Sequence, residues 1–188
     1  MSKAVLISIK PEWCEQIALG KKTIEVRKTY PKLQTPFKCY IYCSIGDRSN
    51  AGDDFYVHPA PEYKPVQGNG RVIGEFVCDG IYSVLSYPNI FAGHPLFHKI
   101  AVDESCLSQR ELEEYSKGKP LCGWHITELV IYDRPKYLKD FIKPCENDLY
   151  CEVCAMYHEF SDQCGNAALK IKRPPQSWCY VEEWSGGD

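Results

Sequence analysis

The stretch 20–27, Gly-Lys-Lys-Thr-Ile-Glu-Val-Arg, contains charged side chains spaced so that several of them would lie on one face of a β-strand. Polar and apolar residues alternate from the threonine onward, which is the period of a β-strand. The alternation predicts that Ile24 and Val26 face a core. It also predicts that Glu25 and Arg27 share the opposite face with the threonine, where one ligand can contact all three polar side chains.

The chemistry of this stretch suits a ligand rich in oxygen atoms. Lys22 and Arg27 can donate hydrogen bonds to a phosphate or to a carbonyl oxygen. Glu25 can orient a base or hold the Arg27 guanidinium in place. The Glu25–Arg27 pair can also be a purely structural ion pair that orders the mouth of a barrel. The residues alone leave both interpretations open.

A cysteine cluster in the polar segment 144–168 is the second group of chemically active residues. Its spacing, Cys-x5-Cys-x2-Cys-x9-Cys, includes a Cys-x-x-Cys knuckle that suits tetrahedral zinc. The expected role of the metal is structural, because a closed four-ligand site leaves no position for water. Four free thiols in a loop are the alternative. The candidate zinc ligands are Cys145, Cys151, Cys154 and Cys164, and His158 can replace the first or the last of them.

Basic residues are distributed unevenly along the chain. Residues 1–40 contain eight Lys and Arg and three Glu, a formal charge of +5. The whole chain carries −3, so the remaining residues carry −8. A basic surface on an acidic protein indicates an anionic ligand at one place, or else a solvated lysine face.

Length and composition narrow the class of protein. The 188 residues, 44% of them hydrophobic, suffice for a single domain over 1–188 with insertions. No stretch approaches the roughly 18 apolar residues of a membrane span, and the first apolar run is too short for a signal peptide. The odd number of cysteines, eleven, favours thiols and metal over a secreted disulfide framework. We therefore expect a cytoplasmic protein without membrane contact.

The first half of the chain predicts the elements that position the charged stretch. A buried strand is expected over 4–9, and Pro11 then begins a helix that Gly20 ends. The charged strand follows, and another strand is expected over 37–43. Residues 46–70, rich in Gly, Pro, Asp and Asn, predict a long loop.

The second half predicts further strands with few helices. Residues 70–84 read as a long strand or hairpin arm, and Ser108 opens a short helix with a capping box. Further expected elements are strands over 123–132 and 177–184 and a helical turn over 135–141. About six strands without a regular β-α-β alternation predict an α+β fold with a curved sheet or barrel.

Taken with Ser8-Ile-Lys-Pro, the stretch 20–27 resembles the signature of the ASCH family, Gly-x-Lys-x-x-Glu-x-Arg. Gly20, Lys22, Glu25 and Arg27 match this signature. Supporting resemblances are Val72-Ile-Gly-Glu-Phe, Gly123-Trp-His-Ile and the closing stretch 173–183, which looks like bacterial and prophage-type members. The resemblance implies a PUA-like β-barrel whose signature residues line a cleft for RNA or a nucleotide. The ligand-binding residues expected on this basis are Lys10, Lys21, Lys22, Thr23, Glu25, Arg27, Trp124 and His125.

Some proteins of this family are enzymes, which provides an alternative function. The resemblance to acetylcytidine amidohydrolases or ribonucleases makes Lys22 the catalytic lysine, with Glu25 as a tentative partner. The catalytic threonine of the amidohydrolases is replaced here by Glu25. A third catalytic residue would be Glu75 or Glu104. A protein-interaction module that uses the cysteine-rich insertion is the remaining alternative.

Several aromatic side chains can stack on a base or fill a core. Trp13, Tyr82 and Trp178 are candidates, together with Trp124 and His125 of the expected ligand set. Core packing is the alternative for each of them. Cys39 and Cys43, four residues apart on a strand, are too distant to share a metal and are expected in the core.

Overall fold

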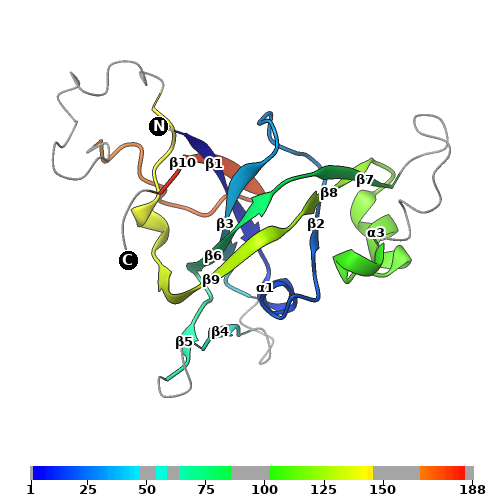
Figure 1. Cartoon of the computed structure of the whole chain (residues 1–188), viewed down its shortest axis with the longest axis horizontal. Helices are drawn as coiled ribbons and strands as arrows, with labels where there is room; N and C mark the ends of the chain where they lie inside the picture. Colours follow the sequence, from blue (N-terminus) through cyan, green and yellow to red (C-terminus); the bar gives the residue numbers. More distant parts are fainter. Residues whose placement is uncertain (1, 47–53, 59–63, 86–101, 146–165, 185–188) are drawn as a thin grey trace.

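A five-stranded sheet carries most of the α+β fold seen in the computed structural model (Figure 1). The structure describes residues 2–46, 54–58, 64–85, 102–145 and 166–184. The strand order is β10-β1-β3-β6-β9, and neighbours are antiparallel except for the parallel pair β1 and β3. The bounds are β1 Lys3–Ile9, β3 Phe37–Cys43, β6 Arg71–Cys78, β9 Thr127–Lys136 and β10 Trp178–Glu182.

A second sheet of three strands has the order β2-β8-β7. Its strands are β2 Ile24–Arg27, β7 Ile81–Leu85 and β8 Leu121–His125. The chain passes from the first sheet to the second between β6 and β7, and it returns between β8 and β9. The long strand or hairpin arm expected over 70–84 and the strand expected over 123–132 are therefore each divided between two sheets.

Backbone hydrogen bonds hold the chain at the place where the two sheets separate. At Ile126, between β8 and β9, the N–H extends the β2–β8 pairing by one residue and donates to the carbonyl of Thr23 at 2.8 Å. Beside it, the His125 N–H donates to the carbonyl of Gly80 at 2.9 Å, in the turn between β6 and β7. Both turns thus meet at one corner. Their hydrogen bonds come from distant segments, which a local sequence pattern does not reveal.

The expected loop over 46–70 contains a short hairpin in its described part. Strands β4 Tyr56–Val57 and β5 Val66–Gln67 pair antiparallel as a third sheet. The α+β class is confirmed, but the expected number of about six strands is too low, since the described residues form ten. The expected helical turn at 135–141 is a single 3-10 turn, η1 Leu138–Asp140, and Pro135 belongs to β9.

Two helices flank the sheets. Helix α1 Pro11–Ala18 starts at the proline, as expected, and buries Cys14 and Ile17. Helix α3 Gln109–Ser116 has Ser108 as its N-cap with a complete capping box, also as expected. Neither these nor the other described helical residues form a helix long and apolar enough to cross a membrane.

Three hydrophobic clusters lie in successive layers. The largest fills the space between the five-stranded sheet, α1 and β8, and contains Ile7, Cys39 and Trp124. Another covers the opposite face of the five-stranded sheet and includes Tyr40 and Phe141. The remaining cluster joins β2, β7 and β8 to Leu112 of α3. The second sheet is therefore packed on both of its faces.

Strand β2 is consequently buried along its whole length. Ile24 and Val26 face the cluster under α3, which confirms them as core residues. Glu25 lies opposite Trp124 in the β2–β8 register, and Arg27 lies opposite Cys122. Since Trp124 and Cys122 belong to the central cluster, the two charged side chains point into the interior between the sheets. The predicted polar face exists, but it is not a solvent-exposed face.

We expect Ser108→Ala to lower the free energy of unfolding by about 1 kcal/mol at neutral pH, because the cap of α3 is lost. Hydrogen bonds from Ser108 lower the pKa of the Glu111 carboxyl below its ordinary 4.5. A depressed carboxyl pKa stabilises the fold above the unfolded pKa and stops doing so as the pH falls through the folded pKa. The difference between wild type and variant, measured by urea denaturation, should therefore shrink below about pH 4.5. A difference that grows in acid would contradict this account.

Candidate functional site

Three buried charges lie together where β2 enters the interior. Glu25 is the central residue, with its Oε1 atom 2.9 Å from Arg27 Nη2 and its Oε2 atom 3.5 Å from Lys22 Nζ. The exposed side-chain fractions are 2% for Lys22, 7% for Glu25 and 10% for Arg27. We call these residues the triad. Its formal charge is +1, since two cations share one carboxylate.

Backbone carbonyls hold the two cations in place. Lys22 Nζ donates to the carbonyl of Ser105 at 2.6 Å, and the Arg27 guanidinium donates to the carbonyl of Ser8 in β1. The Lys22 ammonium also lies over the indole ring of Trp13 in α1, 5.3 Å from its centroid. Fixed dipoles and an aromatic face thus replace part of the water that these charges lose on burial.

Backbone hydrogen bonds fix the start of β2. The Thr23 N–H donates to the carbonyl of Glu104 at 3.0 Å, and the Thr23 carbonyl accepts from Ile126 at 2.8 Å. Helix α1 ends at Ala18, and Gly20, two residues later, has a φ of +68°, which favours glycine. This left-handed turn sends the chain from α1 into β2 and places Lys22 under Trp13.

Part of the triad's hydrogen-bonding capacity is not used by the protein. Among the described residues, Glu25 Oε2 and Arg27 Nε are buried without a hydrogen-bond partner. A buried polar atom without a partner costs about 1–3 kcal/mol, and more when it is charged. Such a cost is typical of a polar site retained for binding or catalysis, although buried ion pairs can also be structural.

Two ionisable groups beside the triad remain neutral near pH 7. Burial raises the pKa of the Cys14 thiol well above its usual value, and neighbouring Cys43 and Glu25 raise it further. Burial also raises the pKa of the Tyr115 hydroxyl, while Arg27 lowers it and Glu25 raises it. Cys14 is therefore a thiol and not a thiolate nucleophile.

The structure brings together only part of the expected ligand set. Lys22, Glu25 and Arg27 converge. The backbone of Thr23 instead bonds to Glu104 and Ile126. Lys21 is exposed next to the triad in sequence, and Lys10 is exposed at the N-cap of α1, where it pairs with Glu12 at 3.6 Å.

Trp124 and His125 differ from what the sequence predicted for them. Trp124 has no exposed surface and contacts Phe37 and Trp178 in the core, so it offers no face for stacking on a base. His125 lies on the opposite face of β8 from Trp124, and its Nδ1 atom is 2.7 Å from Asp79. Alternation along β8 puts these two residues on different faces, which a search for base-stacking residues overlooks.

The two acids considered as a third catalytic residue have different positions. Glu75 lies opposite Tyr40 in the β3–β6 register, on the face of the five-stranded sheet away from the triad. Its carboxylate is held by Lys38 at 3.0 Å and by the Tyr132 hydroxyl. Glu104 instead belongs to the segment that contacts the triad through the carbonyl of Ser105, and its own carbonyl accepts from the Thr23 N–H. Sequence reasoning missed the carbonyls of Ser8 and Ser105, since any residue type supplies a carbonyl.

Most cysteines of the described residues belong to the core. Cys39 and Cys43 are buried, as expected, and so are three others: Cys14, Cys78 and Cys122. Of the predicted zinc ligands only Cys145 is described, and it is partly exposed. Cys151, Cys154, Cys164 and His158 lie outside the described residues. In the described part of the chain, no three side chains form a metal-binding group, so the zinc hypothesis stays a prediction.

Residues 7–136 match the family model of the ASCH domain. The chain belongs to the ASCH domain family. It is also similar, at 20% identity, to two solved structures of the ASCH protein from Zymomonas mobilis. A tyrosine-to-phenylalanine mutant has a TM-score of 0.50 over 97% of this chain and 92% of that one. The protein without a named mutation has a TM-score of 0.49 over 96% and 88%. No curated protein matches the chain in sequence.

We expect different effects from the two ways of changing the triad's charge. Glu25→Gln leaves two buried cations facing each other and should lower the free energy of unfolding by about 3 kcal/mol or more. Lys22→Met leaves a neutral Glu25–Arg27 pair and should cost only about 1 kcal/mol, for the lost hydrogen bond to Ser105. Both values can be measured by chemical denaturation.

Glu12→Gln is the matched control for the first change, because its partner Lys10 is exposed. Its effect should stay below about 0.5 kcal/mol. If Lys22→Met destabilised the fold as much as Glu25→Gln, the charge imbalance of the triad would not be the main cause of the lost stability.

Proposed function

We propose that this ASCH domain binds RNA, and that the triad recognises the edge of one base or modified nucleotide. The observation that carries the proposal is a buried group of charge +1 in which Glu25 Oε2 and Arg27 Nε have no hydrogen-bond partner among the described residues. The resemblance of the signature residues to RNA-facing family members supports the same conclusion.

The triad combines donors and an acceptor within a few ångströms. The Lys22 ammonium and the Arg27 guanidinium can donate to a base carbonyl or a phosphate, whereas the Glu25 carboxylate accepts from an amino or imino group. A nucleobase edge presents both kinds of group. A simple anion, by contrast, would be repelled by Glu25. The mixed character of the triad therefore favours a base edge over an isolated phosphate.

Burial of the triad favours an unpaired nucleotide as the ligand. Bases in a duplex present their edges only in the grooves, and proteins usually read RNA sequence in single strands, loops and bulges. A base extruded from its neighbours can enter a recess that a duplex cannot. Trp13, partly buried beside Lys22, is placed to contact such a base. We infer that the base displaces either this indole or the segment that carries Ser105.

Hydrolysis is the second candidate function, because the segment that contains Glu104 contacts Lys22. The Glu104 carbonyl accepts from Thr23, and the carbonyl of the next residue accepts from Lys22. A lysine and a carboxylate are the groups that an amidohydrolase or ribonuclease of this family would use, and Glu104 is the acid whose backbone lies beside the start of β2. Glu75 is not part of this proposal, because it lies on the other face of the large sheet.

A filter-binding assay with single-stranded and structured RNA tests the binding proposal. Lys22→Met should weaken retention by about tenfold or more, because a donor to the ligand is lost from a buried site. Lys119→Met, which removes an exposed lysine outside the expected ligand set, should change retention by less than about twofold. Equal retention for wild type and Lys22→Met would refute the assigned role of the triad.

The same protein preparations can distinguish an RNA-binding protein without catalytic activity from an enzyme. RNA and acetylcytidine are incubated with wild type, Lys22→Met and Glu104→Gln, and products are identified by mass spectrometry. We expect no cleaved or deacetylated product from the wild type. Product that disappears in both variants would instead establish a hydrolase with Lys22 and Glu104 at its centre.

We also propose a structural zinc ion bound by Cys145, Cys151, Cys154 and Cys164, or with His158 in place of one end ligand. The donor set fits, because four cysteines with this spacing supply the thiolates that tetrahedral zinc requires. Five of the other cysteines are buried in the core, and the Cys106 thiol donates to the carbonyl of Lys21. Zinc would supply folding energy to this segment and no chemistry.

Elemental analysis of protein from zinc-replete cells should find about one zinc per chain. Cys151→Ser and Cys154→Ser should each lower this content strongly, whereas Cys106→Ser should leave it unchanged. A folded wild-type protein without metal would contradict the zinc proposal and would leave the proposal for the triad intact.

A further inference from the structure

The basic residues of the first 40 positions have different environments in the structure. Four of them contact carboxylates of described residues: Lys10, Lys22, Arg27 and Lys38. Lys28 lies over the ring of Tyr115, 4.7 Å from its centroid. Lys3 and Lys32 are exposed and instead line the same groove, together with Lys143 from a distant part of the chain.

This groove has a volume of about 490 Å³ and lies along the edge strand β10. Besides the three lysines, its walls include Cys179 and Tyr180 of β10. None of its described lining residues is acidic, and none of the ion pairs between described residues involves the three lysines. We call this surface, defined by Lys3, Lys32, Lys143 and Tyr180, the β10 groove.

We propose that the β10 groove binds the phosphates of a single-stranded RNA, one nucleotide of which occupies the triad. Three ammonium groups without a counter-ion in the described part of the protein attract a polyanion and gain from counterion release when they neutralise its phosphates. The inference rests on the proposed RNA binding and extends it, because it assigns the path of the strand outside the triad.

The segment between β2 and β3 connects the groove to the triad. Arg27 and Lys32 are five residues apart, so their Cα atoms are separated by at most about 18 Å. The segment is fastened along β10, since Thr29 accepts from the Trp178 indole at 3.1 Å and the Lys32 N–H donates to the Tyr180 hydroxyl at 2.8 Å. A strand of a few nucleotides can therefore contact both places without a rearrangement of this segment.

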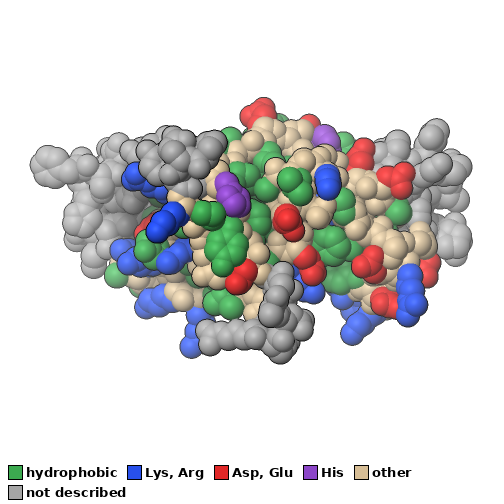
Figure 2. Space-filling model, turned by 90° about the horizontal axis from the view of Figure 1, so that it is seen from below, with side chains coloured by type: hydrophobic (Ala, Val, Ile, Leu, Met, Phe, Trp, Pro, Cys, Tyr) green, Lys and Arg blue, Asp and Glu red, His purple; other side chains and the backbone are tan. Residues whose placement is uncertain are grey.

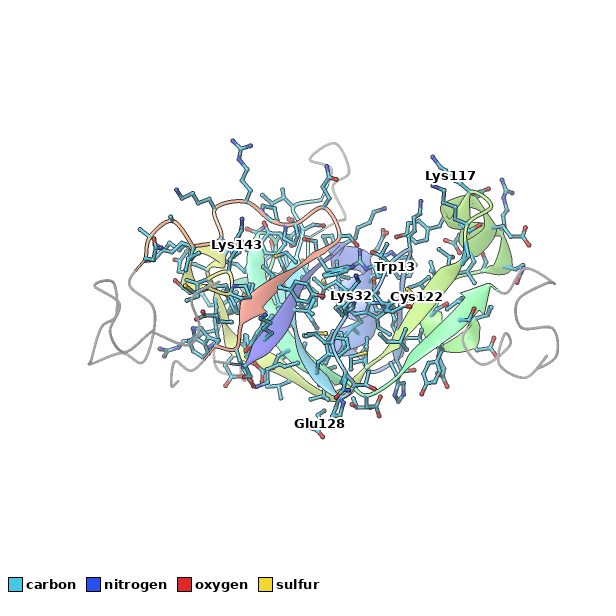
Figure 3. All side chains as sticks on the ribbon, turned by 90° about the horizontal axis from the view of Figure 1, so that it is seen from above. Trp13, Lys32, Lys117, Cys122, Glu128 and Lys143 are labelled. Atoms are coloured by element: carbon cyan, nitrogen blue, oxygen red, sulfur yellow. The ribbon has the colours of Figure 1, made fainter. Side chains whose placement is uncertain are left out.

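Two aromatic side chains lie along this path. Trp178 and Tyr180 are both partly buried, with ring centroids 5.4 Å apart. Alternating basic and aromatic residues are characteristic of surfaces that hold single-stranded nucleic acid, because bases stack while phosphates pair with lysine. Figure 3 shows Lys32 between Lys143 on one side and Trp13 and Cys122 on the other.

A second groove, of about 610 Å³, is less suited to a polyanion. Its walls include the acids Asp79, Glu128 and Glu183, and its Lys38 is already paired with Glu183 at 3.3 Å. The opposite side of the molecule, seen from below in Figure 2, carries basic side chains toward both ends, with acidic ones across the middle and beside the basic ones at the right. The charge pattern thus favours the β10 groove.

The salt dependence of RNA affinity tests the inference. A triple variant with Lys3→Gln, Lys32→Gln and Lys143→Gln is compared with a control of equal charge change, Lys64→Gln, Lys117→Gln and Lys119→Gln. All six lysines are exposed, so both proteins should fold, which circular dichroism checks. Each phosphate contact on a single strand contributes about 0.7 to the slope of log K against log salt. We expect the groove variant to reduce this slope by about 2 and the control to leave it unchanged.

Each outcome has a separate meaning. If both triple variants change the slope equally while Lys22→Met still weakens binding, the β10 groove is refuted and the role of the triad stands. If the groove variant weakens binding of cytidine monophosphate as strongly as that of a short RNA, the groove holds a free phosphate and not a strand. If the wild type binds no RNA at any salt concentration, both proposals fall.

Discussion

The carboxylate of Glu25 is the charge that makes the centre of this fold possible. It lies between Lys22 and Arg27, and without it two cations would be buried together in the interior between two sheets. Moving a charge out of water costs several kcal/mol even after relaxation. The surrounding elements offset part of that cost with oriented carbonyls from Ser8 and Ser105 and with the face of Trp13. The positions of α1, β1 and the 102–107 segment are therefore tied to one carboxylate.

Local signals predicted a large part of the fold. Pro11, Gly20 and the capping box at Ser108 mark helix ends through the chemistry of single turns, and these predictions are confirmed. Strand alternation correctly separated Ile24 and Val26 from Glu25 and Arg27. It could not show that both faces of β2 are covered, because the cover comes from α3 on one side and from the large sheet on the other. The same limitation hid the corner at Ile126, whose hydrogen bonds reach Thr23.

The charged residues of the candidate site could be predicted from the sequence, but the groups that surround them could not. Family resemblance and residue type both identified Lys22, Glu25 and Arg27. The backbone partners carry no signal in the sequence, and the faces of β8 on which Trp124 and His125 lie depend on the register with β2. The basic character of residues 1–40 was visible as a sum of charges. Only the structure separates the side chains that are paired inside the protein from those that remain available along β10.

The backbone hydrogen bonds of Thr23 affect which substitutions this position can accept during evolution. Its backbone N–H and carbonyl connect the Glu104 and Ile126 segments to the start of β2, and these bonds are independent of the side chain. Any residue other than proline can therefore keep the junction intact. A substitution there alters the surface next to Lys22 without dismantling the frame that supports the triad. Position 23 is thus a point at which the surface beside Lys22 can change while the architecture is conserved.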